Sequence, residues 1–581
     1  MTALLLLPAA WATAGFDPTT PAARFEGDEI YTQDGATLLW SAIERLEDPD
    51  RTLLVQEDFT DGITWPDAAA FAPWIADCFG SREPASSSAL LHMARAEGTA
   101  GGTPILLVPG AGDNASRGFI TMASRLNNNT GRPVYALTFA HPHGDVFRHA
   151  EMIANAIARI QHRTGAAQVD LVSHSKGGIA AAVYLSNHTA ASWNRADYES
   201  VGTRYRDDVR KAVFIATPLG GIDTAFRWSQ GNLASLTDDA IAPSAWSTYY
   251  PASSAYYWNY TDLSGVDFLA AGGDPFPGHR QLLARWDDAY PLPGERPAEL
   301  GYYALQTDWY TTYYGGTGYY SDSDGIDAAI AEGNDVLGSL YKNGVDPDVR
   351  LYVLAGDSPL MPNGLEDYLY TTIEDSSWVD LVVATTEVWG AYISELVDAS
   401  VLSVDLDDAE IKALAQGKLL LGEISGDSDG LVFVESATQT RTLTGRGAAV
   451  VETHIANLSH LDLLYASDVT GALLIAAGEA DPVSDGWMAS VGARYTEANS
   501  LGWVEDALAE DGGSGPGDTG EPSDTGEPSD TDTGDDTDTG VDGTASPTTG
   551  GCGACSAAAG PAAGGWVLAL LGLAGWRRRG A

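Results

Sequence analysis

Aliphatic runs separated by a helix-like segment are the feature that most limits the fold of this 581-residue chain. Five runs have the composition of buried strands: residues 103–109, 133–139, 168–172, 211–216 and 350–355. Between the second and third runs, apolar residues recur at helical spacing from Phe147 to Ile160. Because parallel strands need crossover connections that are usually helices, this alternation predicts an α/β fold with a mostly parallel sheet.

Composition excludes several classes of protein. The chain carries 80 Asp and Glu against 31 Lys and Arg, a formal net charge of −49, which repels nucleic-acid phosphates and anionic membrane surfaces. Its 44% apolar content includes 16 Trp, 25 Tyr and 13 Phe, enough to form a large core. Three cysteines cannot make a disulfide-stapled scaffold. We therefore expect a packed, acidic body and no nucleic-acid partner.

The first hundred residues have two parts. Residues 1–14 form an apolar run that ends in Ala12-Thr13-Ala14, the small-x-small form of a signal-peptidase site. This pattern predicts a signal peptide and export, to the cell surface, the outer membrane or the extracellular space. A buried N-terminal element is the alternative, because the run is short and no basic region precedes it. Residues 15–100 are expected to form an N-terminal extension with a helical subdomain.

A linker is predicted over residues 506–550, which are rich in Asp, Thr, Gly and Pro. Such a segment cannot bury enough apolar surface to order its backbone, so we expect it to be solvated and disordered. From Asp511 onward, eleven acidic residues and three arginines give a net charge of −8, which leaves −41 for residues 1–510. The charge is therefore not confined to the tail.

The last segment, residues 551–581, combines a Cys552-x-x-Cys555 motif, an apolar run and an arginine cluster at residues 577–579. It resembles the C-terminal sorting signals of the myxobacterial (MYXO-CTERM) type. This resemblance implies processing near the cysteines, and membrane or cell-surface attachment through the segment. A redox or zinc pair of cysteines and an ordinary C-terminal membrane anchor are the alternatives.

A stretch of sequence rich in aromatic residues and glycine interrupts the α/β pattern over about residues 228–342, for example at Trp246 and at Tyr313-Tyr314. We expect an insertion over the functional edge of the sheet. A cap that lines an apolar substrate cleft and a surface excursion with buried tyrosines are equally consistent with this composition.

Ser175 stands at the point where a strand changes into a helix. The strand that ends near Val172 runs into Ser173-His174-Ser175-Lys176-Gly177-Gly178, and a helix rich in small residues follows. A serine on such a sharp turn projects its hydroxyl above the sheet, so Ser175 is the candidate nucleophile. The usual G-x-S-x-G motif has glycine where Ser173 stands. A serine-rich helix start without catalysis is the alternative.

A second turn supplies candidate donors for an oxyanion. The glycine-rich turn Pro109-Gly110-Ala111-Gly112 follows the first of the five strands, and it can place the backbone N–H of Ala111 opposite that of Lys176. Phosphate binding is the weaker interpretation, because the turn lacks the G-x-G-x-x-G spacing and a P-loop lysine.

Together these motifs resemble those of bacterial lipases and esterases of the α/β-hydrolase superfamily. Residues 214–221 are similar to the family's GTPHRG segment, residues 429–432 to its DGLV segment, and residues 458–462 to its NHLD segment. The resemblance implies an α/β-hydrolase domain over residues 101–505, with Asp429 as the triad acid and His460 as the base. The order Ser, Asp, His along the chain is the order that this fold uses.

Other residues compete for two of these roles. Asp357 directly follows a strand, and Asp427 lies two residues from Asp429. Residues 448–453 predict one more strand, which His454 follows more closely than His460 does. The text around Asp429 and His460 favours them over these rivals. His174 neighbours the nucleophile, and we expect its side chain only to pack.

The resemblance predicts a serine hydrolase of neutral acyl esters or lipids that needs no cofactor. It also implies a structural calcium ion held in part by Asp462, two residues after His460; a solvated loop carboxylate is the alternative. Two other functions stay open: a non-catalytic surface binding or adhesion protein on the same scaffold, and a polyester, thioester or amide hydrolase with the same triad.

Overall fold

The computed structural model describes residues 16–26, 40–48, 57, 72–94, 101–188, 204–223, 226, 261–263, 277–292, 313–317, 321–323, 325–358, 426–480 and 485–510. The chain divides into two compact units, residues 1–508 and residues 509–581. Our expectations for the signal peptide, for the acidic linker beyond residue 510 and for the cysteine motif concern residues outside these ranges. The predicted start of the linker at residue 506 is wrong, because Asp506 and Ala507 belong to helix α21, Ser500–Ala507, and Leu508 is fully buried.

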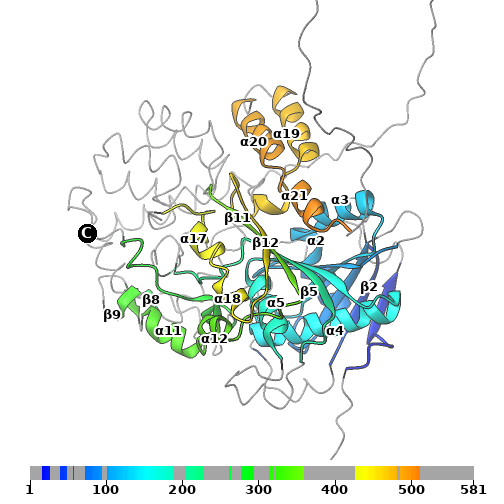
Figure 1. Cartoon of the computed structure of the whole chain (residues 1–581), viewed down its shortest axis with the longest axis horizontal. Coiled ribbons are helices and arrows are strands. Elements are labelled where there is room, and N and C mark those ends of the chain that lie inside the picture. The colour runs from blue at the N-terminus through cyan, green and yellow to red at the C-terminus, as the bar shows by residue number, and fades with distance from the viewer. Residues whose placement is uncertain are drawn as a thin grey trace, which may run out of the picture. The chain divides into compact units, whose positions relative to one another are not determined.

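Among the described residues, nine strands form one sheet in the spatial order β1-β2-β3-β5-β4-β6-β7-β11-β12. Strands β2, β5, β11 and β12 of this sheet are labelled in Figure 1. Six strands run parallel to one another: β5, β4, β6, β7, β11 and β12. Strands β1, β2 and β3 pair antiparallel with their neighbours. Their bounds are β1 Ala23–Glu26, β2 Trp40–Leu46, β3 Ala89–Ala94, β4 Ile105–Val108, β5 Val134–Phe139, β6 Val169–His174, β7 Val209–Ile215, β11 Arg350–Gly356 and β12 Val450–Ala456. The protein is thus a mixed α/β protein with a large, mostly parallel sheet.

The strands and the helix predicted from the sequence are confirmed. The five aliphatic runs form β4, β5, β6, β7 and β11, and the helical spacing corresponds to α4, Val146–Thr164. Helix α4 begins where the Asp145 side chain accepts a hydrogen bond from Phe147 N, and it ends at Gly165, whose φ of 73° is left-handed. Local capping therefore agrees with the periodic pattern at both ends of this helix.

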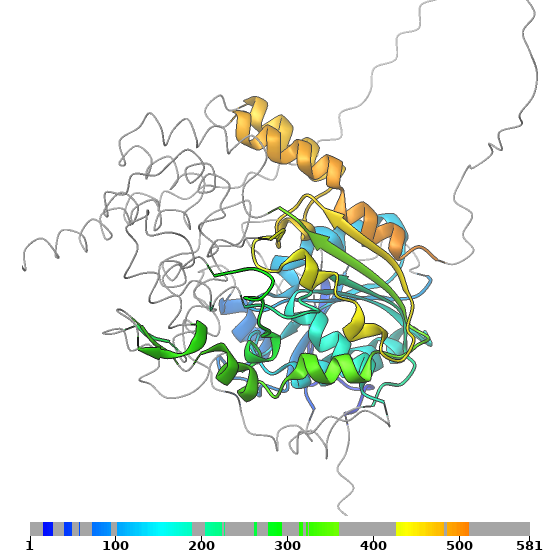
Figure 2. The ribbon, with the colours of Figure 1, turned by 60° about the vertical axis from the view of Figure 1, so that its left-hand side comes forward.

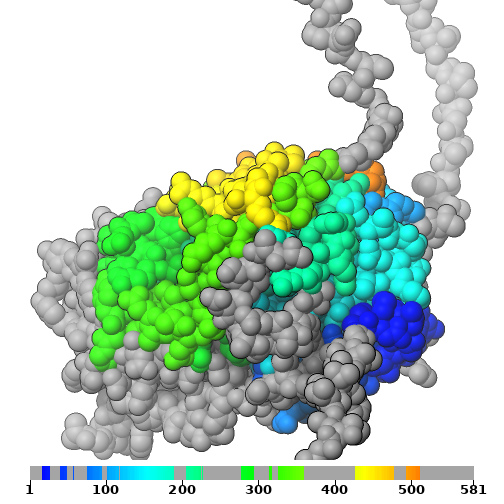
Figure 3. All heavy atoms as spheres, turned by 60° about the horizontal axis from the view of Figure 1, so that its bottom comes forward, coloured from blue at the N-terminus to red at the C-terminus, as the bar shows by residue number. Residues whose placement is uncertain are grey.

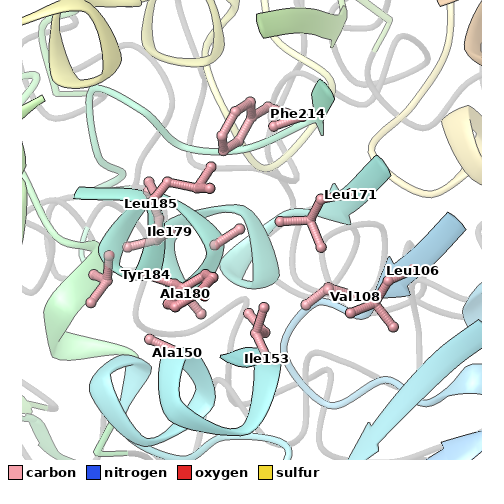
Figure 4. Packing of buried hydrophobic residues seen from close by; sticks show 14 of the residues in the cluster. Leu106, Val108, Ala150, Ile153, Leu171, Ile179, Ala180, Tyr184, Leu185 and Phe214 are labelled. Carbon is pink, nitrogen blue, oxygen red and sulfur yellow. The ribbon is translucent and has the colours of Figure 1, made fainter. Parts of the chain in front are cut away.

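Helices cover both faces of the sheet. Helices α4 and α5 (Lys176–Ser186) pack with one set of alternating strand residues, whereas α3 (Ile120–Thr130) and α21 (Ser500–Ala507) pack with the other set. Ile153 of α4, Ile179 of α5 and Leu171 of β6 belong to one hydrophobic cluster, part of which Figure 4 shows, and all three side chains are fully buried. Burying an aliphatic side chain of this size contributes about 1.5–3 kcal/mol, so this packing holds α5, and with it Ser175, against the sheet.

The N-terminal extension differs from our expectation of a helical subdomain. Its described residues form β1, β2 and β3, which enlarge the main sheet, and the short helix α1, Ala72–Phe79. Strand β2 carries Glu44, whose fully buried carboxylate is held by Arg24, Arg159 and Arg163. An acidic residue in mid-strand hides the strand pattern, because its burial depends on arginines that are distant in sequence.

Parts of the predicted insertion are described. Three short strands, β8 (Thr261–Leu263), β9 (Gly316–Thr317) and β10 (Ser321–Ser323), form a separate small sheet. Helices α11 (Ile326–Glu332) and α12 (Val336–Asn343) follow, and α12 lies against α18, Arg441–Thr444. Figure 3 shows the green residues of this region beside the yellow residues that follow position 426. Trp246 lies outside the described residues, so a cap over the sheet stays a prediction.

A helical hairpin follows the last strand. Helices α19 (Asp468–Ala480) and α20 (Asp485–Ala498) lie side by side in Figures 1 and 2. They approach closely at two glycines: a Cβ on Gly471 would lie 2.4 Å from the carbonyl oxygen of Gly492. In the part of the chain that the structure describes, no helix is both long and apolar enough to cross a membrane.

Candidate active site

Ser175 occupies a strained turn between β6 and α5. Its φ of 50° and ψ of −127° lie in a region that residues with a side chain rarely adopt, at a cost of about 1–3 kcal/mol. The turn is held from both sides, because Ser175 N donates to Ile215 O at 2.9 Å and Gly178 N donates to Ser175 O at 2.9 Å. Ser175 as a whole is 7% exposed. This is the geometry of a nucleophile turn.

Small residues around the turn are required by close backbone approach. A Cβ on Gly177 would lie 2.3 Å from Pro109 O, and one on Gly178 would lie 1.9 Å from Thr217 Oγ1. Ser173, which replaces the usual glycine, is accommodated because its buried hydroxyl donates to Val213 O at 3.1 Å. The departure from the motif is thus compatible with the turn.

The glycine-rich turn after β4 lies beside Ser175, as the sequence predicted. A Cβ on Gly110 would come within 3.0 Å of Ser175 Cβ. Lys176 is the first residue of α5, where backbone N–H groups have no partner inside the helix. The N–H groups of Ala111 and Lys176 therefore belong to segments that meet at Ser175, and they stay our candidates for binding an oxyanion.

Asp429 and His460 form a hydrogen-bonded pair. Nδ1 of His460 donates to Asp429 Oδ2 at 2.8 Å, and both side chains are almost fully buried. The other carboxylate oxygen of Asp429 accepts from Leu431 N at 2.9 Å and from Val432 N at 2.7 Å. With Nδ1 engaged, the imidazole keeps Nε2 for another partner. The two residues that the resemblance selected are therefore brought together.

The rival residues have other surroundings. The ring of His454, on β12, stacks on Trp503 with centroids 5.7 Å apart. Asp357 follows β11. The pKa of its carboxyl group is raised mainly by burial and to a lesser degree by the nearby Asp427 charge. The side-chain hydrogen bond of His460 Nδ1 thus goes to Asp429 rather than to either rival aspartate.

His174 does more than pack. Its Nε2 lies 3.0 Å from His460 O, and because a carbonyl oxygen can only accept, Nε2 must carry the hydrogen. The two imidazole rings lie 4.8 Å apart between centroids. The pKa of His174 is lowered well below its usual value, mainly by burial and to a lesser degree by the His460 charge, so this ring is neutral. The residue before the candidate nucleophile therefore contacts the candidate base directly, which its position in the sequence could not indicate.

Asp462 is engaged by protein donors. Its Oδ1 accepts from the hydroxyl group of Tyr495 at 2.5 Å, and its Oδ2 accepts from Arg494 Nη2 at 3.2 Å. The Arg494 side chain is 3% exposed and also donates from Nη1 to Ser358 Oγ at 3.0 Å. With a buried guanidinium against the carboxylate, these residues do not fit a calcium ion as they stand. Among the described residues, no group of three or more His, Cys, Asp and Glu is placed to hold a metal.

An aromatic group connects the insertion with the loop that carries Asp429. Tyr290 stacks on Phe433 with centroids 4.1 Å apart, and its hydroxyl group donates to Glu435 Oε2 at 2.9 Å. Trp286 Nε1 donates to Gly221 O at 3.0 Å, in the segment after β7. Residues 286–290 of the insertion are therefore attached to two segments at the carboxyl edge of the sheet. The sequence indicated the aromatic content but not this attachment.

A cavity of about 790 Å³ lies elsewhere, at the β1–β3 end of the sheet. Arg24, Met93, Pro133 and Arg163 are among the residues that line it, and none of the candidate site residues does. We therefore do not assign this cavity to the chemistry of Ser175.

Comparisons with known proteins yield structural likeness only. No family model matches this sequence, and no curated protein matches it. Similar solved structures include the mature lipase BlEst2 of Bacillus licheniformis, with 12% identity, 67% of this chain and 97% of that chain covered, and a TM-score of 0.29. The Staphylococcus hyicus lipase has 12% identity and a TM-score of 0.31, and the match covers 71% of this chain and 96% of that chain. The siderophore hydrolase EstB from Aspergillus fumigatus has 14% identity and a TM-score of 0.25, and the match covers 57% of this chain and 93% of that chain. Likeness at this level carries no weight for the activity of this chain.

Proposed function

We propose that this chain is a serine hydrolase of carboxylic esters, with an α/β-hydrolase fold and a triad of Ser175, Asp429 and His460. The observation that carries the proposal is the buried hydrogen bond between His460 Nδ1 and Asp429 Oδ2. It is supported by the contact of His460 with His174, the residue next to Ser175 on the strained turn.

The proposed mechanism starts from a serine hydroxyl group, which is a poor nucleophile until a base removes its proton. His460 Nε2 takes the proton of Ser175 as the Ser175 oxygen bonds to the ester carbonyl carbon. Asp429 holds the imidazole with Nδ1 protonated and stabilises the imidazolium ion that forms. His460 then protonates the leaving alkoxide, and water hydrolyses the acyl-enzyme by the same steps.

The carbonyl oxygen becomes negatively charged when the serine adds. In the proposed site, the backbone N–H groups of Ala111 and Lys176 donate to this oxyanion, and one such donor typically stabilises the transition state by about 3–4 kcal/mol. The N-terminal end of α5, which carries a partial positive charge, also favours an oxyanion beside Ser175, since Lys176 is the first residue of that helix.

Export and tethering to a cell surface are part of the proposal. Their support is the composition of both ends of the chain, an apolar start with a small-x-small site and an acidic linker before a cysteine motif. A body charge of −41 over residues 1–510 favours a neutral acyl ester or lipid substrate over an anionic one.

Hydrolysis of a p-nitrophenyl ester series, from acetyl to palmitoyl, tests this function. We expect turnover by the wild-type chain, and a loss of kcat on the order of 10⁶-fold in Ser175→Ala. Preference for long chains would identify a lipase, and preference for short chains an esterase. Equal rates for wild type and Ser175→Ala would contradict the proposal, and no turnover of esters, thioesters or amides would favour a non-catalytic binding protein.

A further inference from the structure

The side chain of Lys176 has a role that the nucleophile turn itself does not require. The turn uses only the backbone of this residue, yet its side chain is 0% exposed. Lysine is almost never fully buried without a partner, because desolvating its ammonium group is costly. Burial lowers the pKa of Lys176 to about 7, opposed by the charges of Glu57 and Asp145.

The partner of Lys176 is His149 on α4. Lys176 Nζ donates to His149 Nδ1 at 2.9 Å. The other ring nitrogen, Nε2, lies 2.9 Å from His141 O and must carry the hydrogen, which leaves Nδ1 as an acceptor. The ring also stacks on Phe139 with centroids 3.8 Å apart. His149 is therefore held in one tautomer and one orientation, and it offers Lys176 a fixed acceptor.

Residues 278 and 279 of the insertion pack against this pair. Gly278 N donates to His143 O at 3.0 Å, and a Cβ on Gly278 would lie 2.4 Å from Lys176 Cε. His279 Nε2 and His143 Nδ1 lie 3.0 Å apart. Lys176 is thus enclosed by the loop after β5, by α4 and by residues near 278, and none of these elements is part of the nucleophile turn.

We infer that the Lys176–His149 hydrogen bond positions the backbone N–H of Lys176 for the oxyanion, which makes both residues positioning residues of the ester hydrolase. This inference rests on the proposed function. Amide and side chain share one Cα, so an anchored Nζ limits rotation of the first turn of α5. A donor that is already oriented stabilises the transition state more than the bound substrate, so the anchor acts on kcat and not on KM.

Lys176→Met tests the inference, because methionine fills a similar volume without a donor. We expect kcat for a p-nitrophenyl ester to fall about 10- to 100-fold with KM within twofold. Affinity for an alkyl boronic acid, whose adduct with Ser175 places an oxygen in the oxyanion site, should fall by the same factor. Melting temperature should change little, because the gain from removing a buried amine offsets the cost of leaving His149 Nδ1 without its donor. Unchanged kcat, or equal changes in kcat and KM, would overturn the inference.

A second variant guards against misfolding of the first. His149→Leu removes the acceptor without changing the nucleophile turn, and the same selective loss of kcat and boronate affinity is expected. The matched control is His92→Gln, a buried histidine bonded to Thr138 in another part of the sheet, which should keep wild-type kcat. Labelling of wild-type Ser175 by a fluorophosphonate separates the two claims. A labelled wild type with an unaffected Lys176→Met overturns only this inference, whereas an unlabelled wild type overturns both.

Discussion

Asp429 binds His460 at two points, 31 residues apart in the chain. Its carboxylate accepts from His460 Nδ1 at 2.8 Å, and its carbonyl oxygen accepts from His460 N at 2.9 Å. The second bond fixes the backbone of the loop after β12 against the segment that precedes α17, Val434–Ala437, so the ring is oriented by main chain as well as by side chain. A Cβ on Gly356 would lie 2.8 Å from Asp429 Cβ, which keeps that strand end free of a side chain.

Asp429→Asn should lower kcat on the order of 10⁴-fold without unfolding the protein. An asparagine amide group can donate to Nδ1, which favours the wrong tautomer of His460. Ester hydrolysis and thermal unfolding are measured together. The matched controls are Asp427→Asn and Asp357→Asn, which should keep most activity. A larger loss in either control than in Asp429→Asn would transfer the acid role to the rival.

His174→Phe should lower kcat about 10- to 100-fold, because small displacements of a catalytic group have effects of this size. The change leaves His460 O without the donor at 3.0 Å, which also costs about 1–3 kcal/mol of stability. His174→Gln can donate from its amide group and should recover most of the rate. Equal activity of the phenylalanine and glutamine variants would show that the hydrogen bond has no part in positioning His460.

Chelation of divalent cations with EGTA should leave ester hydrolysis and melting temperature unchanged, because Asp462 already accepts from Arg494 and Tyr495. Arg494→Gln should destabilise the chain by about 3–5 kcal/mol, the usual cost of removing one partner of a buried ion pair. Activity that disappears with EGTA and returns with calcium would contradict this view of Asp462.

Stability should fall in mild acid. Burial lowers the pKa of several histidines below their usual value, in the case of His92 to about 3. The unfolded chain takes up these protons below pH 6.5 and the folded chain does not, so the stabilisation present above pH 6.5 is lost as the pH falls. Each such histidine contributes up to about 1.4 kcal/mol per pH unit. The other four are His143, His149, His174 and His279.

Urea unfolding at pH 7, 6 and 5 measures this slope. His92→Gln should reduce it by about one proton, because a glutamine can keep the bond to Thr138 but cannot titrate. A stability that is independent of pH over this range would contradict the neutral, buried state of these histidines.

The part of the fold that the sequence predicts is the part whose pattern is local. The run Ile105–Val108 and the segment around Ser175 combine strand-forming residues with glycines whose spacing already specifies a turn. Strand β2 could not be predicted in this way, since the burial of Glu44 requires Arg159 and Arg163, more than a hundred residues away. Long-range charge pairing leaves no periodic signal.

In the candidate site, too, local sequence predicted only part of the arrangement. The flanking sequence favoured Asp429 over Asp427, but the roles of neighbouring side chains depend on contacts between residues that are distant in the chain. His174 reaches His460 over 286 residues, and Arg494 reaches Asp462 over 32. Lys176 was selected for its backbone alone, because nothing near it in the sequence indicates that His149 would accept from its amine.

The most direct test of the central claim is covalent labelling with a fluorophosphonate, followed by mass spectrometry of the labelled peptide. Such probes react with a serine whose proton is removed by a neighbouring base. We predict one label per chain, on the peptide that contains Ser175, and no label in His460→Ala. A label on a different residue, or a labelling rate that His460→Ala does not change, would contradict the proposed triad.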